Sequence, residues 1–97
     1  MKVAVCRLTL RLHDNRSLKG KRQVVRSLID RIRNKFQASV AEVGDQDQLK
    51  SGLIGIAVVS GDARHAAEMM DQVVEYAESQ LYEADVIDME RDVIDLG

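Results

Sequence analysis

Residues 15–35 read NRSLKGKRQVVRSLIDRIRNK, and this stretch predicts one amphipathic helix with a strongly basic outer face. Ser17 stands where a helix N-cap belongs, because its hydroxyl can accept from the free backbone N–H groups of the first turn. We expect the helix to end near Phe36. Its core side follows three-and-four spacing through Lys21, Val24, Val25, Leu28, Ile29, Ile32 and Phe36, and the opposite side carries Arg22, Arg26, Asp30 and Arg33.

Three strands are expected around this helix. Lys2 to Leu12 alternates between apolar and polar residues, which is typical of a half-buried strand. After the helix, residues 38–43 form a short strand candidate, and GDQDQ at residues 44–48 has the turn residues of a hairpin loop. Residues 53–59, LIGIAVV, are an almost unbroken apolar run, so we expect a strand with both faces covered.

A second helix and a last strand follow. Asp62 or Ser60 is placed to cap the helix, and Glu68, Asp71, Glu75 and Glu78 give it an acidic face. Its apolar stripe comprises Ala63, Ala66, Ala67, Met70, Val73, Val74, Ala77 and Leu81. The final strand is expected from about Asp85 to Val93. The order is β-α-β-β-α-β.

This order predicts one ferredoxin-like α+β domain over residues 1–97, because two right-handed βαβ crossovers give a split-βαβ sandwich. Four antiparallel strands in the order 4-1-3-2 would carry both helices on one face. Val3 and Val5, with alternate residues of 53–59, supply apolar side chains to the face without helices. We therefore expect a homodimer or higher oligomer joined through the open sheet face.

The 97 residues have a formal net charge of −2, which conceals a strong polarity. Residues 1–36 carry +9, and residues 37–97 carry −11. This asymmetry favours an electrostatic partner or self-association. Cys6 is the only cysteine, which excludes an intramolecular disulfide and a cysteine-rich metal site. No apolar run is long enough to span a bilayer, so we expect a cytoplasmic protein without a membrane partner.

The start of the basic helix is the candidate binding site. Cations in a first helical turn oppose the helix dipole, and Gly20 is a poor helix former, so both features favour a functional explanation. Free N–H groups, the dipole and lysines together suit an anion such as phosphate, and Gly20 would let a ligand approach closely. The predicted nucleic-acid or anion-binding residues are Arg16, Lys19, Lys21, Arg22 and Arg26.

Three other interpretations stay open. The basic helix could pair with acidic surfaces, within the chain or in a structural or regulatory oligomer, or could simply be solvated. A small-anion sensor similar to ACT domains has the same element order. Phosphate-ester chemistry, as in acylphosphatases, is a weak alternative: Arg16 lies in the first loop, but the glycine-rich signature is missing. His13 and His65 lack metal-ligand spacing, so we expect no metal, no cofactor and no catalytic residue.

The sequence resembles the YlxP-like family of small bacterial proteins of unassigned function. The blocks SLKGKR at residues 17–22 and NKFQASVAEV at residues 34–43 carry the resemblance most specifically, and it extends over essentially the whole chain. It implies a ferredoxin-like fold. The genes of such proteins often lie among translation-initiation and ribosome-maturation genes, which implies a role close to RNA. The expectation is therefore a non-enzymatic binding module, with rRNA or a ribosomal subunit as partner.

Overall fold

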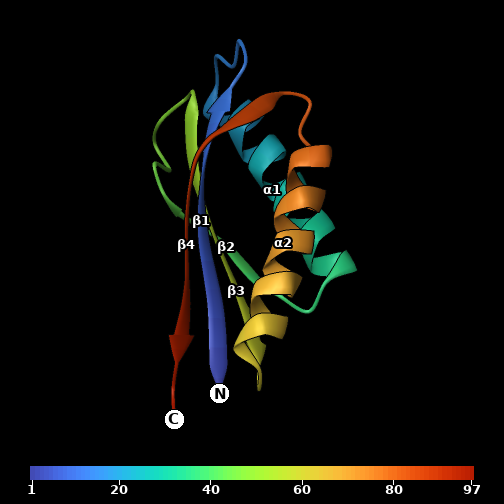
Figure 1. Cartoon of the computed structure of the whole chain (residues 1–97). Coiled ribbons are helices and arrows are strands. Elements are labelled where there is room, and N and C mark those ends of the chain that lie inside the picture. Colours follow the sequence, from blue (N-terminus) through green and yellow to red (C-terminus); the bar gives the residue numbers. More distant parts are fainter.

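The computed structural model describes residues 1–97 and has the expected six elements. They are β1 (Lys2–Leu12), α1 (Leu18–Lys35), β2 (Ser39–Gly44), β3 (Ser51–Ser60), α2 (Ala63–Ser79) and β4 (Ala84–Asp95). The strands form one antiparallel sheet in the order β2-β3-β1-β4, and both helices cover the same face (Figure 1). The predicted ferredoxin-like sandwich and its strand order are confirmed. Neither helix is both long and apolar enough to cross a membrane.

The core lies between the sheet and the two helices. Every second residue of β1 points toward the helices, and Leu8 and Leu10 have no exposed surface. Ile54 of β3 and Ile32 of α1 meet them there, equally buried. Each fully buried side chain of this size contributes about 1.5–3 kcal/mol relative to an exposed one. This burial fixes which side of α1 faces solvent.

The helix starts follow the predicted caps. The Ser17 hydroxyl accepts a hydrogen bond from the Gly20 N–H at 3.0 Å, and α1 ends where Phe36 turns to an extended conformation. The Asp62 carboxylate accepts from the Arg64 N–H at 2.8 Å and opens α2. Each cap satisfies one N–H that the helix itself leaves without a partner.

The apolar run in β3 has one covered face. Ile54, Ile56 and Val58 are buried beneath the helices, whereas their neighbours face the open side and Val59 remains 61% exposed. The expectation that both faces are covered is therefore wrong within one chain. β3 is a central strand, and the fold leaves its second face open, so the apolar residues on that face meet solvent within one chain (Figure 1).

Candidate nucleic-acid interface

Lys19, Arg22 and Arg26 share one exposed stripe on the solvent side of α1. Together they line a shallow, wholly polar surface that also includes Gln23, Ser27, Asp30, Arg31 and Asn34. The three cations span two helical turns, or about 10 Å at 1.5 Å per residue. None of the ion pairs or side-chain hydrogen bonds of the structure involves them. Their charges are therefore solvated and free to meet an external anion.

A second hollow joins this stripe to the edge strand β2. Arg22, Arg26 and Arg33 line it from α1, opposite Ala41 and Glu42. The Arg33 guanidinium also donates a hydrogen bond to the Val40 carbonyl, which holds it at the outer side of β2. Arg33 is absent from the predicted site. Its position in the sequence could have indicated that it belongs to the site, because it lies seven residues after Arg26 and therefore on the same side of the helix.

Lys21 does not belong to this surface, which corrects the prediction for that residue. Only 1% of it is exposed, and its ammonium contacts the Asp45 carbonyl and lies 3.5 Å from the Glu42 carboxylate. The Lys21 position belongs to the core side of the helix, so its stem packs inward and carries the charge to the β2–β3 loop. Asp45 adopts a left-handed conformation, with φ of 57°, and its carboxylate accepts from Ser51. Lys21 therefore ties α1 to this loop.

Gly20 also has an explanation within the chain. A Cβ at this position would lie 2.5 Å from the Asn15 side-chain oxygen. The Asn15 amide donates to the carbonyls of Ser17 and Leu49, so it joins the β1–α1 connection to the β2–β3 loop. The glycine makes room for this side chain. The contact with Asn15 accounts for the glycine without a ligand at Gly20. The Ser17 hydroxyl already accepts from the Gly20 N–H and caps the first turn.

Arg16 is exposed in the β1–α1 connection, one residue before the cap. It lines none of the described hollows of α1, so the structure does not join it to the stripe of Lys19, Arg22 and Arg26. Of the five predicted residues, Lys19, Arg22 and Arg26 share one surface. Arg16 lies outside this surface, in the β1–α1 connection, and Lys21 is buried. We use the name cationic stripe for Lys19, Arg22 and Arg26.

The acidic side chains of α2 form no ion pair with the cationic stripe. The contacts between polar groups of the two helices and their ends are a hydrogen bond from Arg31 to Gln80 and the Lys35 ammonium 4.5 Å above the Tyr76 ring. Two acids of α2 are paired elsewhere: Glu68 with Arg64, and Asp71 with Arg91. The structure contains no ion pair between α1 and α2, so the alternative that α2 neutralises α1 within one chain is not supported.

The remaining reactive side chains lie outside this surface. Cys6 is buried beneath the helices, and this burial raises the pKa of its thiol more than the Arg91 charge lowers it. His13 bonds Asp85 at 2.8 Å, and that hydrogen bond with the carboxylate charge raises the pKa of His13. No group of three or more His, Cys, Asp or Glu side chains is arranged to hold a metal ion.

Fold and surface together define a small ferredoxin-like α+β protein that displays a cationic helix face. The chain belongs to the family described as "Protein of unknown function (DUF503)", which matches residues 3–91. It is 34% identical over 68 residues to the "Uncharacterized protein YlxP" of Bacillus subtilis (strain 168), a match that covers 70% of this chain and 74% of that protein. The YlxP-like resemblance of the sequence is thereby confirmed.

The fold has a counterpart among solved structures. A de novo designed protein with a ferredoxin fold, determined by solution NMR, superposes with a TM-score of 0.57 over 100% of this chain and 88% of that one. The sequence identity is 17%, so the likeness concerns the fold alone.

Proposed function

We propose that the protein is a non-enzymatic binding module that holds RNA by its phosphate backbone through the cationic stripe. The observation that carries this proposal is a two-turn row of three cations without any partner inside the chain. Arg31 and Arg33 flank the row, and Asp30 is the only acid of the helix. Arg and Lys side chains on such a surface are suited to phosphate oxygens.

The recognition would be largely independent of base sequence. The chain has three aromatic residues, and none lies on the open face of the sheet, where RNA-recognition folds stack bases. A helix face that offers mainly cations and short polar side chains contacts the phosphate backbone, and its affinity depends on counterion release. The translation-linked setting implied by the family resemblance makes ribosomal RNA the polymer to test first.

The test is fluorescence anisotropy with a labelled 20-nucleotide single-stranded RNA at low salt. The site variant replaces Lys19, Arg22 and Arg26 by Gln, and the control replaces three exposed cations elsewhere by Gln, namely Lys50, Arg64 and Arg11. We expect the site variant to lose at least tenfold in affinity, and the control to lose less than threefold. Equal losses would assign the binding to net charge, and unaltered binding by the site variant would remove the assignment.

Binding to ribosomal subunits is the second arm of this test. Purified subunits are sedimented with the protein at low salt, first with the parent and then with Lys19→Glu/Arg22→Glu. Co-sedimentation of the parent that the reversal abolishes supports the proposal. A parent that binds neither the RNA nor the subunits would refute it, and would direct attention to small anions by thermal-shift measurements.

A further inference from the structure

The face of the sheet that carries no helix is apolar along β3 and at one end of β1, and it is charged along β4. Three exposed side chains stand out on it: Val59 of β3, Val43 of β2 and Ile94 of β4, with 61%, 55% and 49% of their surface exposed. Strand pairing places Val3 of β1 between Val59 and Ile94, in one row across the sheet. This surface continues over the partly exposed Val5 and Ala57. Contiguous apolar surface of this kind marks a contact site.

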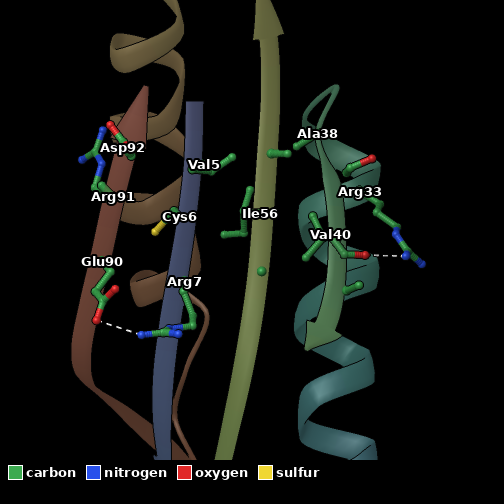
Figure 2. A pocket seen from close by; sticks show the side chains of 14 residues that line it. Val5, Cys6, Arg7, Arg33, Ala38, Val40, Ile56, Glu90, Arg91 and Asp92 are labelled. Carbon is green, nitrogen blue, oxygen red and sulfur yellow. Dashed lines mark hydrogen bonds and ion pairs between the residues drawn. The ribbon is translucent and has the colours of Figure 1, made fainter. Parts of the chain in front are cut away.

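A hollow of about 850 Å³ crosses the middle of the face, perpendicular to the strands (Figure 2). Its floor is low because Ala41, Gly55 and Ala57 have small side chains or none. Arg33 lines the hollow beside β2, and Glu90, Arg91 and Asp92 line it on β4 (Figure 2). The two arginines near the β4 end are already paired, Arg7 with Glu90 and Arg91 with Asp71 of α2, so Asp92 is the carboxylate left at that end. The central row joins Ser39, Ala57, Val5 and Asp92 from one edge to the other.

The charges at the two ends are not equally satisfied. Glu90 pairs with Arg7 at 2.8 Å, whereas Asp92 has no cation within the chain and accepts only from the Val93 N–H. At the other end Arg33 donates to the Val40 carbonyl and has no carboxylate. The hollow therefore has an unpaired cation at its β2 end and an unpaired carboxylate at its β4 end.

We propose that a second copy of this chain covers the open face, related by a two-fold axis that runs parallel to the strands between the two sheets. Such a rotation reverses the order of the strands across the sheet. Residues that are paired across the sheet in one copy keep the same position along the strand direction in the other copy. β4 of one copy then lies opposite β2 of the other, and Asp92 faces the neighbourhood of the partner's Ser39, next to Arg33. The same contact occurs twice in an isologous dimer.

The alternative two-fold axis, perpendicular to the strands, gives a worse arrangement. It would place β4 against β4 and bring Asp88, Glu90 and Asp92 of the two copies together. Like charges in an interface are unfavourable, so the charge polarity of the face selects the axis along the strands. Packed sheets would then align within about 30°, as in β-sandwiches.

The area of the face suits a stable dimer. β1 and β3 pair over ten residues, about 34 Å at roughly 3.4 Å per residue, and four strands at about 4.8 Å spacing span about 19 Å. Because β2 has only six residues, each copy would cover roughly 580 Å², and the pair about 1,200 Å², at the lower limit of specific interfaces of roughly 1,200–2,000 Å². The cationic stripe lies on the helix side of the sheet, so this contact leaves it free in both copies (Figure 1).

Sedimentation equilibrium between 1 and 100 μM tests the inference. We expect a dimer for the parent and a monomer for Val5→Glu or Ala57→Glu, with at least a hundredfold weaker association, because each would bring two carboxylates close to the axis. Gln72→Glu adds the same charge on exposed α2 and should leave the dimer intact. Circular dichroism verifies that each variant is folded. A monomeric parent, or a folded Val5→Glu dimer as stable as the parent, would overturn the inference.

Charge reversal tests the axis. Arg33→Glu and Asp92→Arg should each weaken the dimer by about tenfold, because attraction becomes repulsion in two symmetric contacts. The double variant should regain most of the association, since the reversed pair attracts again. A dimer that Asp92→Arg strengthens would contradict this axis, because that outcome fits β4 against β4. Failure of the double variant to recover would contradict it as well.

Discussion

Replacing Lys21 by Met should destabilise the fold far more than the loss of a surface lysine. The Met side chain keeps much of the buried stem but removes the ammonium that lies 3.5 Å from Glu42. One oxygen of that carboxylate is buried and has no hydrogen-bond partner, so the Lys21 charge is its main compensation. The variant would leave this charge and the Asp45 carbonyl without their cation.

The magnitude follows from the burial of the pair. Removing one partner of a fully buried ion pair costs about 3–5 kcal/mol. The side chain of Glu42 is 21% exposed, so water can reach it in part, and we expect about 2–3 kcal/mol. For a domain of this length, that loss lowers the melting temperature by roughly 10–15 °C.

Urea unfolding followed by circular dichroism measures the effect, with the cycle Lys21→Met, Glu42→Gln and the double variant. The double variant should recover at least about 1 kcal/mol relative to the sum of the single losses, because it leaves no buried charge unpaired. A Lys21→Met protein within about 0.5 kcal/mol of the parent, or additive losses in the cycle, would refute the reasoning. Folded Lys21→Met should bind RNA as the parent does, since Lys21 lies outside the cationic stripe.

Two further predictions concern the His13–Asp85 pair at the start of β4 and Gly20 in the first turn of α1. Because Asp85 raises the pKa of His13, the pair should stabilise the fold below the ordinary His pKa of about 6.5 and lose this effect as pH rises through the raised value. The melting temperature of His13→Gln should therefore fall below that of the parent at pH 5.5 and match it at pH 9; an equal gap at both would contradict the assignment. Gly20→Ala should destabilise the parent by roughly 1 kcal/mol, because its Cβ displaces Asn15, despite the better helix propensity of alanine. In an Asn15→Ala background the same change should stabilise the protein, and a gain in both backgrounds, measured by urea unfolding, would exclude the steric explanation.

Much of the fold could be predicted from local patterns. The alternation of residues 2–12 and the three-and-four spacing after Ser17 each identified an element within a residue or two of its ends. The strand order followed from chirality rules that hold for any right-handed βαβ unit. β3 was harder, because an apolar run does not tell whether its second face is covered by the same chain or by another.

The candidate site was predicted less well, for a physical reason. Lys21 and Arg22 are neighbours in the sequence, yet one points into the core side and the other into solvent. The helical spacing already placed Lys21 with the apolar residues, and its charge obscured that information. The partners of Lys21 lie far along the chain, at Glu42 in β2 and Asp45 in the β2–β3 loop. Asn15, which explains Gly20, is held by Leu49 of the same loop, and no local pattern connects these positions to α1.

The salt dependence of RNA affinity tests the central claim most directly. If the three cations of the stripe each neutralise one phosphate, the slope of log K against log salt should be about −2 for single-stranded RNA. Affinity should then fall roughly 20-fold between 50 and 200 mM salt. Replacing Lys19, Arg22 and Arg26 by Gln should bring the slope close to zero, while the control variant keeps it. A parent slope near zero, or a slope that the site variant retains, would contradict the account.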